Sequence, residues 1–264
     1  MTWRVLTWNI LGAKNGDPVA IAAHVRRSNP DVVALQEIRR RQAKELASLL
    51  GWNMVWRRKH YPFSPLVWWR AEGQALIAPT RLVDARHYVL SRGASAWTYR
   101  HRIMLAATVE RGSDRLRVCN VHLSSSDADE RIAQARRAAQ FIAAELAVLR
   151  VVCGDMNAAN ELEVIREFHA VGVRDTGGDF TNPSRAPAQR LDYVLVSENA
   201  KVSAIDTPDG GDEWAALSDH LPVLVEFSAE GFLQPEVYVP GIRRQETLGA
   251  GAAAANPRPR DAAG

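Results

Sequence analysis

Short apolar runs typical of strands alternate along this chain with amphipathic segments typical of helices. The helical segments begin or end at recognisable signals, such as Asp17-Pro18 at a start and Gly51 at an end. The expected strands are residues 2–10, 31–35, 73–77, 103–109, 116–123, 151–153, 191–196 and 221–227, and the expected helices are residues 17–28, 39–50, 126–149 (capped by Ser126) and 161–171. No internal repeat is present, and many strands with interspersed helices predict a layered α/β fold.

Polar side chains stand where the predicted core strands end. They are Asn9, Glu37, His122, Asp155, Asn157, Asp192, Asp219 and His220. A single polar residue at a strand end usually just stabilises a turn, and Asp219-His220 alone could be a turn with a satisfied hydrogen bond. Because strand ends of a layered sheet converge, the whole set instead predicts a single cleft rich in carboxylate, amide and imidazole groups.

Six short motifs carry these residues in a fixed order. They are Thr7-Trp8-Asn9, Leu35-Gln36-Glu37, Asn120-Val121-His122-Leu123, Gly154-Asp155-Met156-Asn157, Arg190-Leu191-Asp192-Tyr193 and Ser218-Asp219-His220. No single motif is specific, but the ordered set resembles the endonuclease/exonuclease/phosphatase superfamily, which includes deoxyribonuclease I, abasic-site endonucleases, inositol polyphosphate 5-phosphatases and sphingomyelinases. The resemblance implies an α/β (α+β) four-layer sandwich of two packed, mostly antiparallel sheets flanked by helices, in a domain over residues 1–228. It also implies metal-dependent hydrolysis of a phosphoester.

The resemblance further implies a metal site on one side of the cleft. Glu37 would hold the ion, helped by Asn9 and Asp219. Oxygen ligands of this kind suit Mg²⁺ or Mn²⁺, and no cysteine or second histidine cluster argues for zinc.

The resemblance to this family also implies catalytic roles for the other motif residues. Asp155 would orient or deprotonate the attacking water, and Asn157 would hold the phosphate or that aspartate. His220, steadied by Asp192, would bind and stabilise the phosphorane-like charge. His122 would serve the leaving-group side.

Glu72 resembles the acidic partner of that leaving-group histidine in deoxyribonuclease I. The alternative for Glu72 is an exposed glutamate at a strand edge.

Departures from the family's patterns bear on the substrate. Leu11 stands where abasic-site endonucleases carry an aspartate, and His122 where they carry a tyrosine. Tyr193 stands where 5-phosphatases carry an arginine. The segment from Phe180 to Ser184 resembles compact bacterial members instead, and its Thr181 is either a residue that orients the site or an ordinary loop threonine.

Aromatic and cationic residues alternate in residues 52–70 and, more weakly, in residues 97–102. Such stretches stack bases and neutralise phosphates, or alternatively form strands with aromatics packed below and cations in solvent. If these stretches bind nucleic acid, the predicted substrate-binding residues are Arg70, Trp97, Arg100 and Thr181. Such binding predicts a nuclease of low sequence specificity acting on DNA or RNA, since nothing resembles a recognition helix.

Two other functions stay open at this point. A phospholipid or small-phosphoester hydrolase would keep the chemistry, and residues 61–66 are its weak candidate for a membrane-contacting hairpin. A non-catalytic binding module on the same scaffold is disfavoured, because Glu37, Asp155, Asp192 and His220 are all present.

Composition adds modest constraints. Lys and Arg exceed Asp and Glu by 33 − 30 = 3, a charge that suits a polyanionic substrate without requiring one. Cys119 and Cys153 lie in apolar runs and are expected to be buried free thiols. The strand-like start at Met1 leaves no room for a signal peptide, so a soluble, cytoplasmic protein without a stable protein partner is expected. Residues 229–264, rich in Gly, Ala, Pro and Arg, are predicted to be a disordered tail.

Overall fold

The computed structural model describes residues 1–59, 70–92, 101–145, 149–159 and 161–229. The predicted tail, residues 229–264, lies almost entirely outside these ranges, so its disorder stays a prediction. The same holds for residues 61–66, the candidate membrane-contacting hairpin.

Two six-stranded sheets form the body of the described chain. The first has the order β11 (Ala200–Asp206), β12 (Val223–Ala229), β1 (Thr2–Asn9), β2 (Val32–Arg39), β4 (Glu72–Ala78) and β3 (Asn53–Arg58). The second has the order β5 (Leu82–Val89), β6 (Ile103–Arg111), β7 (Asp114–His122), β8 (Arg150–Asp155), β10 (Asp192–Ser197) and β9 (Val173–Asp175). Only the central pairs β1–β2 and β7–β8 are parallel, so the prediction of mostly antiparallel sheets is confirmed.

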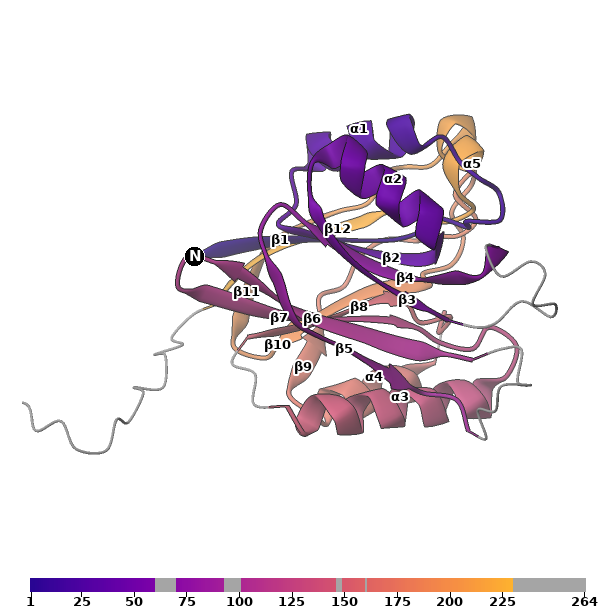
Figure 1. Cartoon of the computed structure of the whole chain (residues 1–264). Helices are drawn as coiled ribbons and strands as arrows, with labels where there is room; N and C mark the ends of the chain where they lie inside the picture. The colour runs from indigo at the N-terminus through magenta and orange to yellow at the C-terminus, as the bar shows by residue number, and fades with distance from the viewer. Residues whose placement is uncertain (60–69, 93–100, 146–148, 160, 230–264) are drawn as a thin grey trace, which may run out of the picture. The chain divides into compact units, whose positions relative to one another are not determined.

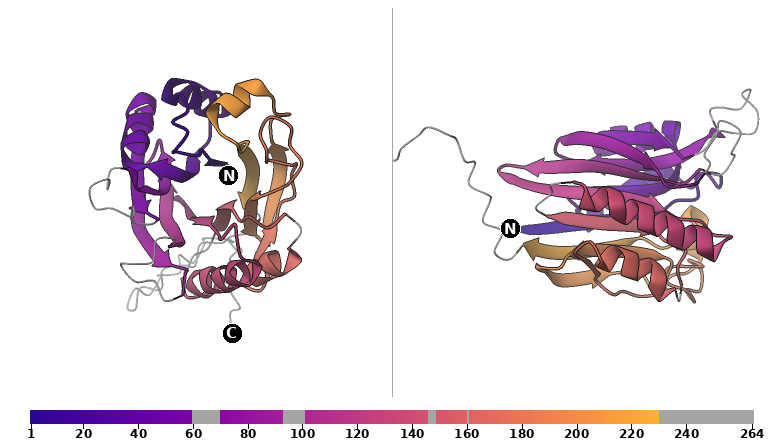
Figure 2. Two further views of the ribbon diagram at one scale, coloured as in Figure 1. Left: turned by 90° about the vertical axis from the view of Figure 1, so that its right-hand side faces the viewer. Right: turned by 90° about the horizontal axis from the view of Figure 1, so that it is seen from below.

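Helices cover the outer face of each sheet. Helices α1 (Pro18–Ser28) and α2 (Arg40–Leu50) lie over the first sheet, and α3 (Ala128–Ala143) and α4 (Leu162–His169) lie over the second (Figures 1 and 2). The short α5 (Asp212–Leu217) precedes β12. Asp17 caps α1 by accepting a 2.9 Å hydrogen bond from the Val19 amide, and Gly51 ends α2 with φ +73°.

Apolar side chains fill the three spaces between these four layers. Those between the sheets include Val5, Leu76, Leu105, Val151 and Phe227, all buried. Each such side chain contributes roughly 1.5–3 kcal/mol through burial. The alternation of inward and outward residues along the strands therefore places one face of each sheet in the shared core. The two free cysteines are buried, as expected.

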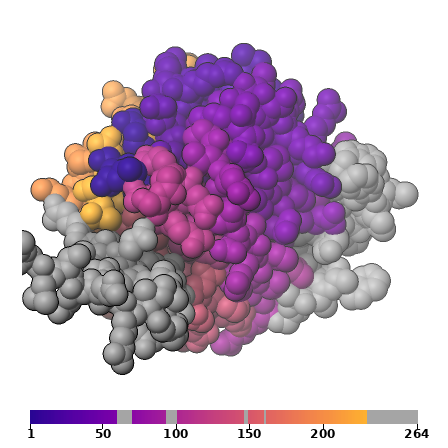
Figure 3. All heavy atoms as spheres, turned by 60° about the vertical axis from the view of Figure 1, so that its left-hand side comes forward, coloured from indigo at the N-terminus to yellow at the C-terminus, as the bar shows by residue number. Residues whose placement is uncertain are grey.

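The ends of the described chain lie together on one face. Thr2 pairs with Ser228 in the antiparallel β1–β12 ladder, and Figure 3 shows the indigo N-terminal atoms beside the yellow atoms of β12.

The third long helix differs most from its sequence prediction. The third long helix begins after Asp127, whose carboxylate accepts a hydrogen bond from the Glu130 amide, rather than after Ser126. It ends at Ala143 rather than residue 149, because Glu145 is held by Arg117 and Tyr88 and the chain turns there toward β8. Strands β5, β9 and β11 and helix α5 were not predicted, and β3 lies in residues 52–70, where a strand was one of two alternatives.

An aromatic cluster joins α1 and α5 to β1. The imidazole of His24 packs edge-on against Trp8 and Trp214, with ring centroids 5.7 and 4.7 Å away. Burial and the neighbouring Arg27 lower the pKa of His24 to about 4, against an opposing effect of Asp206. His24 is therefore neutral in the folded protein at pH 6, where an exposed histidine is partly charged.

The stability of the protein is expected to fall between pH 6.5 and pH 4 because of this histidine. A pKa that is lower in the folded state means that the unfolded chain binds the proton first, so the stabilisation present above pH 6.5 is lost as pH falls through about 4. After discounting for solvent screening, the loss is about 1–2 kcal/mol.

Urea unfolding at several pH values measures this loss. The His24→Gln variant should lack that part of the pH dependence, whereas His87→Gln, at an exposed position of β5, should retain it. Equal pH dependence in both variants would contradict the assignment.

Candidate active site

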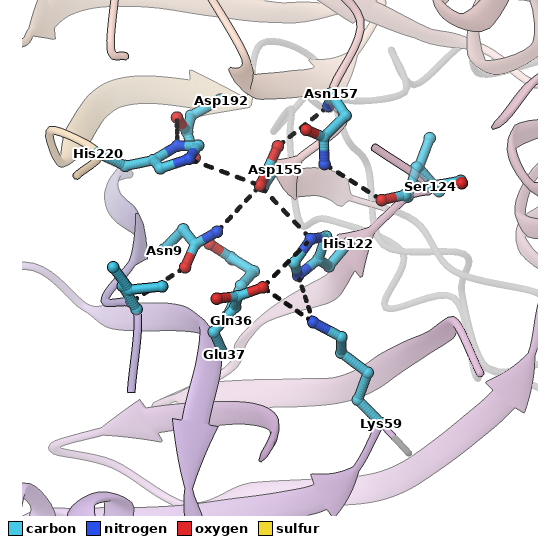
Figure 4. A network of polar contacts seen from close by, with 12 residues as sticks. Asn9, Gln36, Glu37, Lys59, His122, Ser124, Asp155, Asn157, Asp192 and His220 are labelled. Carbon is cyan, nitrogen blue, oxygen red and sulfur yellow. Dashed lines mark hydrogen bonds and ion pairs between the residues drawn. The ribbon is translucent and has the colours of Figure 1, made fainter. Parts of the chain in front are cut away.

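Strand register brings the predicted polar residues to one end of the two sheets. In the first sheet Asn9 lies beside Gln36. In the second sheet Asp155 lies between His122 and Asp192. His220 immediately precedes the turn into β12, so both sheets contribute side chains to the network in Figure 4.

Asp155 is the centre of this network. Its Oδ1 accepts a 3.0 Å hydrogen bond from the Asn157 backbone amide, and its Oδ2 accepts one of 2.9 Å from Asn9 Nδ2. The Nε2 atoms of His122 and His220 lie 3.5 and 3.9 Å from the same Oδ2. Burial raises the pKa of Asp155 to about 6, with a lowering effect of His220 and a raising effect of Asp192. The carboxylate is thus close to the range in which a general base works at neutral pH.

Gly154 is required for this placement. Its φ is +135°, and a Cβ atom there would lie 2.0 Å from the carbonyl oxygen of Val121 on the neighbouring strand. Any side chain would push β8 away from β7, and Asp155 would move with it.

His220 and Asp192 form a buried ion pair. His220 Nδ1 lies 2.7 Å from Asp192 Oδ2, and Thr181 Oγ1 donates a 2.6 Å hydrogen bond to the same oxygen. Burial by itself would lower the pKa of His220, but Asp192, helped by Asp155 and Asp219, raises it to about 10. The imidazole is therefore positively charged at neutral pH, with Nε2 directed at Asp155 (Figure 4).

A bulge in β2 places Glu37. The pairing with β4 shifts register between Leu35 and Ile38, and Glu37 itself has φ +56°, a left-handed conformation that is costly for a residue with a side chain. Such outliers concentrate at functional sites. The bulge turns Glu37 toward Lys59 and His122 instead of leaving it in the alternating pattern of the strand.

Lys59, which directly follows β3, connects the two acidic residues of this side of the site. Its Nζ lies 3.0 Å from Glu37 Oε1, 3.8 Å from Glu72 Oε2 and 3.4 Å from His122 Nδ1. Its side chain is only 6% exposed, so this cation is desolvated. Burial and Arg102 lower the pKa of Lys59, against the opposing charge of Glu37.

Glu72 belongs to the same group. Burial and the neighbouring Glu37 carboxylate raise the pKa of Glu72, while Lys59 opposes them. Its strand β4 pairs with both β2 and β3, and the side chain is 16% exposed, so the alternative of an exposed strand-edge glutamate does not apply. The ammonium of Lys59 lies within contact distance of both Glu72 and His122.

Ser218 ties the last motif to the first. Its hydroxyl donates a 2.6 Å hydrogen bond to the backbone oxygen of Asn9 and accepts one of 3.2 Å from the His220 amide. The indole of Trp8 donates to the backbone oxygen of His220. These contacts hold the turn at Asp219-His220 against the end of β1.

Three buried amides behind the site were not nominated from the sequence. Gln36 donates a 2.8 Å hydrogen bond to Asn120 Oδ1, and Asn120 donates to the Leu35 and Ala75 backbone oxygens. Gln74 bonds the backbone of Ile103 and Leu105. All three cross from one sheet to the other. Gln36 and Asn120 belong to two of the six motifs. Lys59, which the sequence analysis also did not nominate, belongs to the basic and aromatic stretch of residues 52–70. Membership in these segments is the feature of the sequence that could have indicated their place near the site.

The predicted site residues thus fall into two groups. The contacts above join Asn9, Glu37, Glu72, His122, Asp155, Asn157, Thr181, Asp192 and His220 into one network, while Asp219 lies half-buried beside Ser218. Arg70 is exposed, and Trp97 and Arg100 lie outside the described residues. The catalytic, metal-binding and substrate-binding roles stay predictions.

The donor set suits a hard divalent ion. Carboxylate oxygens are the preferred ligands of Mg²⁺ and Mn²⁺, and His122 Nε2 lies 3.8 Å from Glu37 Oε1 and 3.5 Å from Asp155 Oδ2, so carboxylates of both sheets reach the same part of the site. Within the described ranges, one trio has its ligand atoms within 4.8 Å of one another, namely Asp155, Asp192 and His220. In that trio Asp192 Oδ2 and His220 Nδ1 already contact each other, so these atoms are not free to bind an ion. The predicted ion would therefore lie next to Glu37.

Two packed six-stranded sheets with an Asp-His pair and facing carboxylates at a shared end define a class of phosphoesterases. A model of the endonuclease/exonuclease/phosphatase family matches residues 6–220. The chain belongs to this family, and it is a phosphoester hydrolase. Members generally use a divalent metal ion.

Solved structures share the fold. An endonuclease/exonuclease/phosphatase from Beutenbergia cavernae is 22% identical, with a TM-score of 0.69 over 86% of this chain and 72% of that chain. The human nocturnin catalytic domain with bound sulfate is 21% identical (TM-score 0.66, 86% and 94%), and the Bacteroides thetaiotaomicron mannosyl-6-phosphatase is 17% identical (0.67, 86% and 99%). A search of curated proteins found no match. Of the helices in the described ranges, none has the length and apolar character needed to cross a bilayer.

Proposed function

We propose that this protein is a divalent-metal-dependent phosphodiesterase, a nuclease of low sequence specificity that hydrolyses DNA or RNA. The observation that carries the proposal is the position of Asp155 between an amide that orients it, Asn9, and a charged imidazole, His220. The Asp155 carboxylate can act as a base that activates water, and the charged His220 beside it can stabilise the negative charge of a phosphoryl group under attack.

The residues around the proposed metal position would divide the work. Glu37, with Asn9 and Asp219, would hold Mg²⁺ or Mn²⁺, and the bound ion would polarise a phosphoryl oxygen and stabilise charge on the leaving oxygen. Asp155 would accept the proton of the attacking water, since its raised pKa makes it a stronger base than an exposed aspartate.

His220 and His122 would act on opposite sides of Asp155. His220, kept charged and oriented by Asp192 and Thr181, would bind the phosphoryl oxygens through Nε2. His122 would serve the leaving-group side, with Lys59 at its Nδ1. Asn157 would keep Asp155 in place through its backbone amide.

Cations surround this centre and favour a polyanionic substrate. The charges of Arg39, Lys59 and Arg102 act on Glu72, and Arg102 also acts on Asp155. Cations beside a carboxylate-rich centre offset its negative charge for an approaching phosphate, which supports nucleic acid as the substrate.

A metal-by-substrate screen tests the proposal. The purified full chain should cleave plasmid DNA and single-stranded RNA of unrelated sequences with Mg²⁺ or Mn²⁺, and excess EDTA should lower the rate at least about 100-fold. Parallel assays should use a sugar phosphate and sphingomyelin vesicles. Intact nucleic acid with either metal across pH 6–9, together with hydrolysis of the sugar phosphate or the lipid, would refute the nuclease assignment.

A further inference from the structure

A basic groove of about 540 Å³ opens beside the catalytic network. Among the described residues, six cationic or imidazole side chains line it, and no carboxylate does. They are Arg40, Arg57, Arg58, Lys59, His87 and His101. Its volume is in the range of pockets that bind small organic ligands.

The groove lies where the two sheets meet along one side. Strand β3 is the edge of the first sheet, and β5 is the edge of the second. Arg57 and Arg58 come from the end of β3, and His87 from β5. Arg40 is the first residue of α2. The topology therefore gathers cations that are far apart in the sequence.

Lys59 joins the groove to the catalytic centre. It lines the groove and at the same time contacts Glu37 and His122 of the network. A ligand in the groove would therefore lie next to the position proposed for the metal and the leaving group. Asp155 itself does not line the groove.

Some cations of the groove are paired with carboxylates and others are not. Lys59 is neutralised by Glu37 and Glu72. Arg40 and Arg57 are exposed, and within the described ranges neither forms an ion pair with a carboxylate; Arg57 donates only to the backbone oxygen of Trp56. The outer part of the groove thus carries the excess positive charge.

Trp56 gives the groove a rigid wall. Its indole nitrogen donates a 2.9 Å hydrogen bond to the Ile38 backbone oxygen, and its ring packs where a side chain at position 73 would otherwise stand. A wall that is already held in place needs no further ordering when a ligand binds beside it.

We infer that this groove binds two successive phosphates of a nucleic-acid strand, next to the phosphate that is cleaved. The inference rests on the proposed nuclease function and makes it more specific: the enzyme distinguishes a strand with successive phosphates from an isolated phosphodiester. Arg40 and Arg57 supply the charge, and the strand continues from the metal side of the centre past Lys59.

Binding without cleavage tests the groove separately from the chemistry. The full chain is titrated into a fluorescein-labelled single-stranded octathymidylate in EDTA, at salt concentrations from 50 to 300 mM. The variant is Arg40→Gln/Arg57→Gln, whose positions are both exposed, and the matched control is Arg41→Gln/Arg166→Gln, which removes two exposed arginines outside the groove.

Each phosphate contact with a single strand contributes about 0.7 to the slope of log K against log salt. Loss of two contacts should therefore flatten the slope by about 1.4 and weaken binding about 10- to 25-fold at 0.1 M salt. The control should keep the slope of the wild type. An unchanged slope in the groove variant, or an equal change in the control, would overturn the inference.

A small substrate separates this failure from failure of the proposed function. Hydrolysis of bis(4-nitrophenyl) phosphate, which has a single phosphate, should be unchanged within about twofold in the groove variant, while KM for the oligonucleotide rises about tenfold. If the wild type hydrolyses neither substrate, the nuclease proposal fails, and the binding titration still decides the groove. Loss of binding to phosphatidylserine vesicles with unchanged oligonucleotide binding would overturn the inference in favour of a membrane surface.

Discussion

Replacing His220 by alanine is expected to lower kcat for phosphodiester hydrolysis by about 10³-fold or more, with a much smaller change in KM. A positioned charged imidazole stabilises charge that develops only in the transition state, and loss of such groups typically costs two to four powers of ten. Steady-state kinetics on bis(4-nitrophenyl) phosphate and on an oligonucleotide measure both parameters.

The fold must be monitored alongside activity. The substitution leaves the Asp192 carboxylate buried with the Thr181 hydroxyl as a remaining partner, and an uncompensated buried charge costs about 3–5 kcal/mol. His220→Asn keeps a donor near Asp192 and serves as the better-folded second variant. His169→Ala, at an exposed position of α4, is the control and should be fully active.

The Asp192→Asn/His220→Ala double variant adds a further check. If the two residues act as a unit, the double variant should be about as slow as His220→Ala alone. Turnover within tenfold of wild type in folded His220→Ala would rule out the proposed role of the imidazole.

Replacing Lys59 by methionine is expected to destabilise the metal-free protein by about 3 kcal/mol. The Glu37 and Glu72 carboxylates, both largely buried, would then face each other without the ammonium that lies 3.0 and 3.8 Å from them. For a domain of this size the loss corresponds to a decrease in Tm of roughly 6–12 °C in EDTA.

Metal ions should reverse much of this loss. A divalent cation held by Glu37 would replace the missing charge, so saturating Mg²⁺ should raise the Tm of Lys59→Met more than that of the wild type. Differential scanning calorimetry with and without Mg²⁺ measures the difference. Lys44→Met, at an exposed position of α2, should match the wild type in both conditions. Equal Mg²⁺ shifts in Lys59→Met and wild type would contradict a metal position next to Lys59.

Local patterns in the sequence explain why the core strands and main helices could be predicted. Asp17-Pro18 and Gly51 mark a helix start and a helix end through local backbone chemistry alone. The apolar runs of β1, β8 and β10 are buried on both faces and stand out for that reason. Strands β3, β5 and β11 are more exposed, so their patterns are weak, and only pairing with a neighbour makes them strands.

The motif residues could be nominated for the same site because strand ends in a layered fold converge. Their contacts could not be derived in the same way. The bulge that turns Glu37 depends on the pairing of β2 with β4, and the link from Asn9 to Asp155 depends on the distance between two sheets. Neither is a property of a local segment.

The sequence by itself therefore determined the family, the layered α/β architecture and the residue types of the site, since these follow from local patterns and the order of six motifs. The tertiary structure alone decided that Lys59 lies buried between Glu37, Glu72 and His122, and that Arg40, Arg57 and His87 share one groove. The reason is physical: burial and ion pairing of these side chains arise only when strands distant in the chain become neighbours at the edges of two sheets.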